Sequence, residues 1–171
     1  MPETTKAVFR VVVNGSIDAV WRELTKQGEA QAAVFNCWLH AQALAVGNEM
    51  QMRTGSGKYA MVVGRITAFE PPHRFAHTFR FTQYDDPECE VIYQLKELPA
   101  GVECILTVDR MPVGTKTAKD MQGGGSMITN TLKAVVETGK PSLATRLMYF
   151  VFANMEFVLS KKSQVQNWPM K

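Results

Sequence analysis

The chain has 171 residues, of which 46% are apolar and 20% are charged, and its formal net charge is +3. This balance excludes a disordered chain, and the scattered basic residues exclude a nucleic-acid-binding footprint. The length is that of a single domain with room for a substantial hydrophobic core.

The three cysteines, Cys37, Cys89 and Cys104, lie far apart and form no Cys-x-x-Cys pair. Their odd number and wide spacing indicate reduced thiols rather than a disulfide framework, as in a cytosolic protein. The first ten residues lack the layout of a signal peptide, and the apolar run 147–153 is too short to span a bilayer. We therefore expect a cytoplasmic protein without a membrane span.

The N-terminal third begins with a strand and then favours helix. Residues 6–15 are rich in valine and end at Asn-Gly, which predicts a strand and a turn. Segment 16–28 predicts a helix, because Ser16 is a favourable N-cap, apolar residues recur at helical spacing and Gly28 can end it. A second short helix is predicted over 29–35.

From residue 37 to residue 110 the pattern changes to strands. Valine- and aromatic-rich segments alternate with short turns marked by glycine, proline, asparagine and aspartate. With the N-terminal strand they predict a seven-stranded antiparallel meander. The six further strands are expected at 37–46, 48–54, 59–70, 74–83, 89–98 and 102–110.

A loop over 111–125 and a long helix are predicted next. Ile128, Leu132, Val135 and Val136 form one apolar stripe, and Gly139 and Pro141 end the helix. The three glycines 123–125 lack the spacing of a dinucleotide or P-loop motif, and so does Gly-Ser-Gly at 55–57. We expect a flexible hinge at the first run and a hairpin turn at the second.

This element order favours an α+β fold of the helix-grip kind. A twisted seven-stranded antiparallel sheet would curve around the long C-terminal helix, with two short helices inserted after the first strand. A sheet that wraps one helix often leaves a cavity between them, and such cavities bind ligands.

Four motifs in the same order resemble the AHSA-type family, the homologues of an activator of a heat-shock chaperone ATPase. This family belongs to the SRPBCC/START helix-grip superfamily. The motifs are "VNGSIDAVWRELT" (13–25), "GRITAFEPPHRFAHTFRF" (64–81), "CEVIYQLKELPAGVECILTV" (89–108) and "LKAVVETGKP" (132–141). The resemblance covers residues 6–141, which form the expected helix-grip domain within 1–141. Residues 142–171 would add a helix and tail packed on that domain or on a partner.

The chain departs from the family pattern just before the long helix. Where the family carries Trp-Pro after two glycines, this sequence has Gly125 and Ser126, and Glu103 and Asp109 replace a usual Thr and His. The missing tryptophan would either enlarge the cavity or be replaced by Trp38 or by the C-terminal helix.

The resemblance implies that a small hydrophobic molecule binds between the sheet and the long helix. Two alternatives remain open. One is a protein–protein module that activates a heat-shock chaperone ATPase. The other is a cyclase- or hydrolase-like enzyme that uses His77, His40 or Asp109 in the cavity, although the sequence contains no recognisable nucleophile–base motif and no catalytic residue is predicted. No metal-ligand spacing is present and no cofactor is predicted.

Alternation along the predicted strands selects the residues expected to line the cavity. His40 and His77 alternate with apolar side chains, so each is either a ligand contact or a core-edge histidine with a hydrogen-bond partner. The expected lining set is Trp38, His40, Met52, His77, Phe79, Tyr93, Leu106, Ile128 and Leu132.

The last helix, predicted over 142–162, has an unusually wide apolar stripe. It comprises Leu143, Leu147, Phe150, Val151, Met155 and Val158. Such a stripe would pack on its own domain, pair with a second chain in a homodimer, or lie on a membrane surface. The few basic residues favour a protein contact over a membrane, so we expect a monomer or a homodimer formed through this helix.

Overall fold

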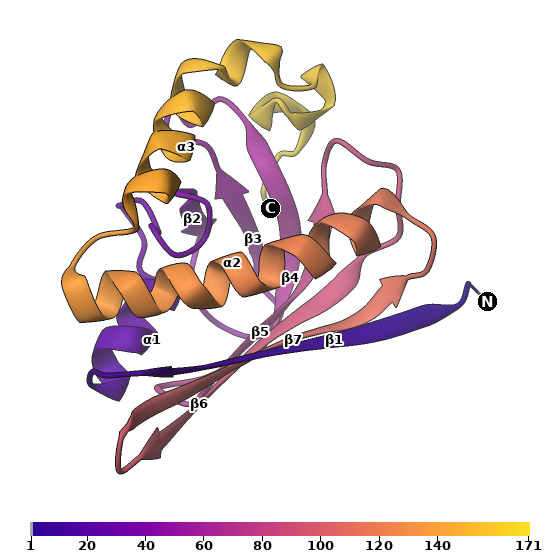
Figure 1. Cartoon of the computed structure of the whole chain (residues 1–171). Coiled ribbons are helices and arrows are strands. Elements are labelled where there is room, and N and C mark those ends of the chain that lie inside the picture. The colour runs from indigo at the N-terminus through magenta and orange to yellow at the C-terminus, as the bar shows by residue number, and fades with distance from the viewer. Residues whose placement is uncertain (1) are drawn as a thin grey trace.

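Seven antiparallel strands form a single curved sheet in the computed structural model, which describes residues 2–171 (Figure 1). The strand order is β1-β7-β6-β5-β4-β3-β2, so consecutive strands are neighbours except at β1, which pairs with the last strand. The strands are β1 (Thr4–Val13), β2 (Trp38–Ala41), β3 (Glu49–Arg53), β4 (Ala60–Glu70), β5 (Arg74–Phe81), β6 (Cys89–Leu98) and β7 (Gly101–Pro112). The predicted α+β meander is confirmed.

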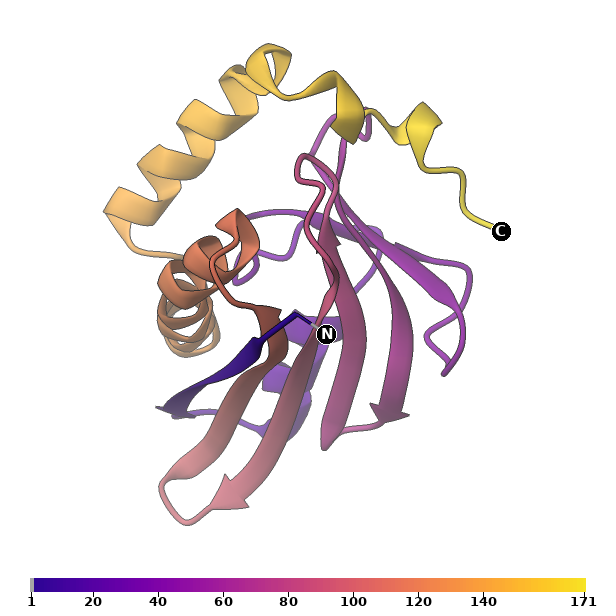
Figure 2. The ribbon, with the colours of Figure 1, turned by 90° about the vertical axis from the view of Figure 1, so that its right-hand side faces the viewer.

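The long helix α2 (Lys116–Thr138) lies across the concave face of the sheet (Figures 1 and 2). Its Ile128 and Leu132 are buried in the same core cluster as alternate residues of β6 and β7, including Tyr93 and Leu106. Because strand side chains alternate between the two faces, this cluster identifies the concave face on every strand. The predicted helix-grip arrangement is therefore present.

Only one of the two short helices predicted after β1 forms. Helix α1 (Ile17–Thr25) begins at the predicted N-cap, where Ser16 Oγ accepts a hydrogen bond from Ala19 N at 3.1 Å. Residues 29–35, predicted as a second helix, form turns and an isolated bridge instead. Left-handed conformations follow at Phe35 and Asn36, with φ of 53° and 57°, which no α-helix accommodates.

The glycine run lies inside α2, so the predicted loop over 111–125 and the hinge at 123–125 are wrong. Thr115 caps the helix through a 3.1 Å bond from Ala118 N, and the helix starts ten residues earlier than the apolar stripe suggested. A Cβ on Gly125 would lie 2.1 Å from a ring carbon of Phe9, whereas one on Gly124 would lie 3.5 Å from the Phe35 ring. Gly125 is therefore required by close packing, and Phe9 rather than Trp38 lies over it.

The C-terminal thirty residues bridge the two faces of the sheet (Figure 2). Helix α3 (Leu143–Asn154) is followed by three 3-10 turns, η1 (Glu156–Val158), η2 (Lys161–Ser163) and η3 (Val165–Asn167). The tail then reaches the convex face, where Gln51 Nε2 donates to Trp168 O at 2.6 Å and Arg80 lies over the Trp168 ring. Within residues 2–171, no helix combines the length and apolarity needed to cross a bilayer.

Candidate ligand site on the concave face

Strand register divides the predicted lining residues between the two faces of the sheet. Leu39 pairs with Met52, which pairs with Val62, and all three are in the concave core. Trp38 pairs with Arg53, and His40 with Gln51, so both lie on the convex face. The expectation that Trp38 and His40 line the cavity is therefore wrong. Their strand is short and buried on one face only, which the sequence pattern did not reveal.

His40 and Asp109 have polar surroundings away from the cavity. Partial burial, assisted by the nearby Arg53 guanidinium, lowers the pKa of His40 below its ordinary value. Asp109 follows the buried Val108 on β7 and forms an ion pair with Lys6 at 3.3 Å. Neither residue can act in the concave cavity, which removes two of the three side chains considered for an enzymatic role.

A row of aromatic rings runs along the concave face of β5. Ring centroids lie 5.4 Å apart between Phe75 and His77, 6.4 Å between His77 and Phe79, and 4.8 Å between Phe79 and Phe81. Tyr84 continues the row at 5.6 Å from Phe81. Such rings provide a wide apolar surface with defined edge and face contacts.

Exposure along this row changes from one end to the other. Phe75 and His77 are buried, whereas Phe79 and Phe81 are half-buried. The remaining concave members of the predicted set are buried in the closed core: Met52, Tyr93, Leu106, Ile128 and Leu132. Only the end of the row that contains Phe79 and Phe81 is open, and His77 marks its inner limit.

His77 is the polar group at this inner limit. Its Nδ1 donates to the carbonyl oxygen of Thr78 at 2.8 Å, so the neutral ring has its acceptor at Nε2. No hydrogen-bond partner for Nε2 is present in the described part of the chain. Burial lowers the pKa of His77, which keeps the ring neutral near pH 7.

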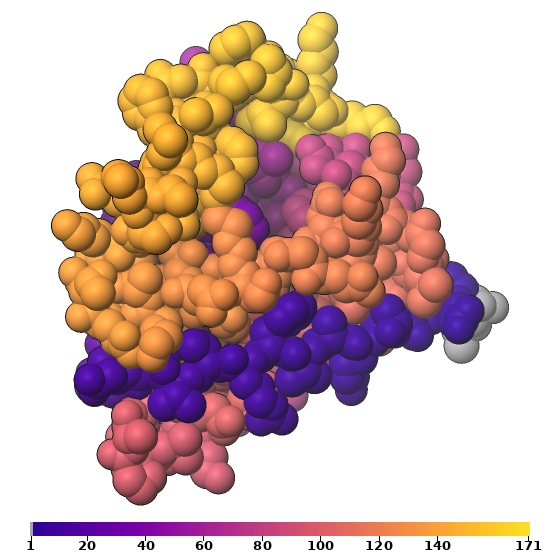
Figure 3. Space-filling model, viewed as in Figure 1, coloured from indigo at the N-terminus to yellow at the C-terminus, as the bar shows by residue number. Residues whose placement is uncertain are grey.

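Helix α3 and the turns that follow it form an arch beside α2 (Figures 1 and 2). Figure 3 shows a hollow between α2 and the arch formed by α3 and the following turns, with atoms of the sheet visible behind it. The arch is fastened by Tyr149, the buried residue of α3, whose hydroxyl donates to Ala32 O at 2.8 Å. The hollow is therefore bounded by α2 and the arch, with the sheet at its back.

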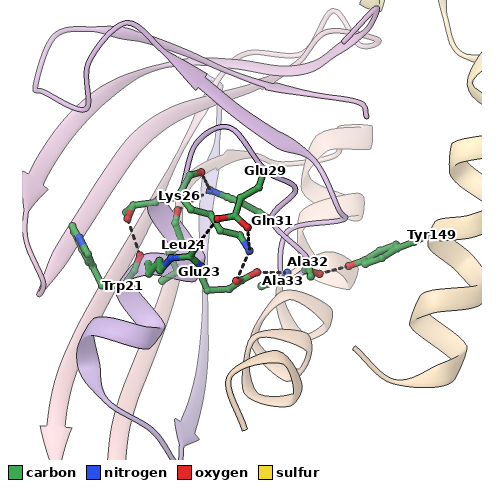
Figure 4. Close-up of polar contacts among 11 residues, drawn as sticks. Trp21, Glu23, Leu24, Lys26, Glu29, Gln31, Ala32, Ala33 and Tyr149 are labelled. Atoms are coloured by element: carbon green, nitrogen blue, oxygen red, sulfur yellow. Dashed lines mark hydrogen bonds and ion pairs between the residues drawn. The ribbon is translucent and has the colours of Figure 1, made fainter. Parts of the chain in front are cut away.

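A polar network holds the irregular segment to which Tyr149 is bonded (Figure 4). Glu23 and Lys26 form a largely buried ion pair at 2.7 Å, and Glu23 Oε1 also accepts from Ala33 N at 3.3 Å. The buried Gln31 amide donates to the carbonyls of Leu24 and Lys26 at 3.2 Å each. These side chains pair with the backbone N–H and C=O groups that helical hydrogen bonds would otherwise pair. They therefore hold the segment in an irregular conformation.

Several residues that shape the site lie outside the predicted lining set. Phe81 is one of them, although it continues the inward alternation of Phe75, His77 and Phe79 along the strand. Tyr149 is the only tyrosine of the predicted last helix, and a polar tip on an otherwise apolar helix could have indicated its hydrogen bond. Phe35 contacts α2 through a left-handed backbone, for which the sequence contains no local signal.

The concave sheet, the enclosed helix and the hollow between them define a helix-grip protein. The family model "Activator of Hsp90 ATPase homolog 1-like protein" matches residues 14–137. This chain belongs to that family, as its motifs indicated. No curated protein sequence matches it.

Solved structures with the same fold are distant in sequence. A protein of Mesorhizobium loti has a TM-score of 0.65 at 16% identity, and the match covers 78% of this chain and 97% of that one. The Aha1 dimer of Colwellia psychrerythraea has a TM-score of 0.62 at 15% identity, and the match covers 80% of this chain and 98% of that one. An Hsp90 activator of Plasmodium falciparum has a TM-score of 0.61 at 13% identity, and the match covers 80% of this chain and 97% of that one. These likenesses establish the fold alone.

Proposed function

We propose that the protein binds a small, largely apolar molecule in the hollow between the concave face and the α2–α3 arch. The observation that carries this proposal is the change in exposure along the aromatic row. Phe75 is fully packed, but Phe79 and Phe81 are half-buried and keep part of their ring surface uncovered. Apolar concave surface with a few polar groups is the ordinary composition of a ligand pocket.

The polar group in this proposal is His77. Its unpartnered Nε2 accepts a hydrogen bond, so the preferred ligand carries a hydroxyl or N–H group at one end. The aromatic rings of Phe79 and Phe81 would contact the apolar body of the same ligand. A ligand donor at this acceptor would add a hydrogen bond that no other group of the described chain supplies.

The proposal is tested by titrating the protein with the fluorescent probe anilinonaphthalene sulfonate. Phe79→Ala and Phe81→Ala should each raise the Kd of the probe about tenfold, because each removes an aromatic wall of the hollow. Val46→Ala is the control, since that side chain is 64% exposed and belongs to neither the aromatic row nor α3. Equal affinity in all four proteins, or loss only in Val46→Ala, would sink the pocket proposal.

Native mass spectrometry of the freshly purified protein gives an independent measurement. An extra mass that is retained by wild type, lost on denaturation and absent from Phe81→Ala would support the pocket and narrow the chemistry of its ligand.

A second candidate is contact with a heat-shock chaperone, favoured by the family membership and by the relative from Plasmodium falciparum, which is described as an Hsp90 activator. In this case the protein should raise the ATP hydrolysis rate of purified Hsp90. An unchanged rate at saturating protein would remove this candidate. Phe81→Ala should not alter the stimulation, because Phe81 faces the hollow and not the outer surface.

A further inference from the structure

Helix α3 carries an apolar surface on the side that faces away from its own domain. Its domain contact is made by the buried Tyr149 together with the half-buried Thr145 and Met148. On the opposite side, Leu143, Leu147 and Phe150 are 77%, 63% and 65% exposed. A helix that is apolar on all sides is normally covered on all sides, so a second contact is missing from the isolated chain.

The exposed apolar residues of α3 and of the turn that follows it form a substantial patch. Phe150 of α3 and Phe157 of the following turn alone leave roughly 200–350 Å² uncovered, if each aromatic residue offers about 150–250 Å². Leu143, Leu147 and Val151 add to it. The largest apolar patch of a typical monomer is about 300–600 Å², whereas one side of a stable protein interface covers about 800 Å². The apolar surface of α3 and the following turn therefore has the size of a functional patch, and a dimer would bury it together with neighbouring surface.

The spacing of the exposed residues fits a helix partner. Leu143, Leu147, Phe150 and Asn154 follow one another at intervals of four, three and four, which is the seam of a helix pair with one polar position. The residues that contact the domain fall outside this seam. Two seams of this kind can pack together while both domains remain on the outside.

The charge pattern selects a second copy over a charged partner. Between Leu143 and Asn154, Arg146 is the only lysine, arginine, aspartate or glutamate. The seam itself contains no charged residue. Homodimer interfaces are more apolar than other interfaces, and a two-fold interface must be complementary to itself. An uncharged apolar seam meets that condition, and a single cation offers little attraction for an anionic membrane.

From these observations we propose that α3 pairs with α3 of a second copy of this chain. The two helices run antiparallel about a two-fold axis between Leu147 and Phe150, so that Leu147 meets the partner's Phe150. In this arrangement Arg146 lies beside the partner's Val151 and not beside its own copy, which avoids repulsion between like charges. The pairing goes beyond ligand binding and does not depend on it.

Sedimentation velocity of the full chain from about 1 to 100 µM tests the pairing, a range that brackets a micromolar Kd. Wild type should dimerise, and Leu147→Glu or Phe150→Glu should raise the dimer Kd at least about tenfold. Val46→Glu is the matched control, because Val46 is 64% exposed and far from α3 in sequence. Far-UV circular dichroism and the probe titration above verify that each variant keeps its fold and its pocket.

Cysteine cross-linking tests the antiparallel register. A mixture of Leu147→Cys and Phe150→Cys proteins should form a disulfide between the two variants under mild oxidation, and Val46→Cys mixed with Phe150→Cys should not. A monomeric wild type at every concentration, or a dimer unaffected by both glutamate variants, would overturn the proposal. Flotation of a monomeric wild type with vesicles of mixed neutral and anionic phospholipids would also overturn it, in favour of a membrane surface.

Discussion

At the scale of single residues, glycines 123–125 meet three different surroundings within one helix. A Cβ at Gly123 would point into open space, one at Gly124 would make ordinary contact with Phe35, and one at Gly125 would collide with Phe9. Glycine lowers helix stability relative to alanine unless packing requires it. The run therefore combines one glycine that the fold needs with two that cost stability.

Alanine substitution should change the free energy of unfolding in one direction at Gly123 and Gly124 and in the opposite direction at Gly125. Gly123→Ala and Gly124→Ala should each raise the free energy of unfolding by about 0.5–1 kcal/mol. Gly125→Ala should lower it by about 1–3 kcal/mol, because the Phe9 ring must move. Urea denaturation followed by circular dichroism measures all three. In a Phe9→Ala background Gly125→Ala should become stabilising, and a penalty that persists there would show that the ring is not its cause.

At the scale of elements, the strands were predictable and the helix boundaries were not. Alternation along β4 to β7 identified each strand within a few residues, because one face of the sheet is buried and the other is not. The start of α2 was missed because its first ten residues include three glycines and little apolar periodicity. Its cap at Thr115 and its packing against β1 outweigh that low propensity.

The segment between α1 and β2 shows why tertiary contacts limit prediction from sequence. Residues 29–35 have reasonable helix propensity, yet the Glu23–Lys26 pair and the Gln31 amide fix them as turns. Their partners are up to ten residues away, so no local pattern indicates them. For the candidate site, the sequence identified His77 and Phe79 through strand alternation. The sequence alone could not assign Trp38 and His40 to the convex face, because that assignment depends on how β2 pairs with β3.

At the scale of the whole molecule, His77 connects pH to global stability. Burial lowers its pKa in the fold, while the unfolded chain keeps a value near 6.5. Above pH 6.5 both states are neutral at this site, and its contribution to stability is complete. As the pH falls below about 6.5, the unfolded state binds a proton that the fold does not, so the free energy of unfolding decreases.

Replacement of His77 should flatten this pH dependence. Between pH 7.5 and pH 5, wild type should lose up to about 1.4 kcal/mol per pH unit from this group, and His77→Asn should lose that slope while keeping a donor for Thr78 O. The exposed His73→Asn is the control and should behave as wild type. Urea midpoints across the pH range provide the measurement. Parallel curves for wild type and His77→Asn would contradict a neutral buried His77.

The pairing of β1 with β7 has a consequence for the synthesis of the protein. Val11 lies opposite Cys104 and Val13 opposite Val102, so β1 meets its partner strand only after the ribosome has made the five strands and the helix between them. During that interval a valine-rich segment has unpaired backbone groups and can join the strand of another nascent chain. Synthesis rate and chaperone supply should therefore govern the yield of this protein more than the stability of its finished fold.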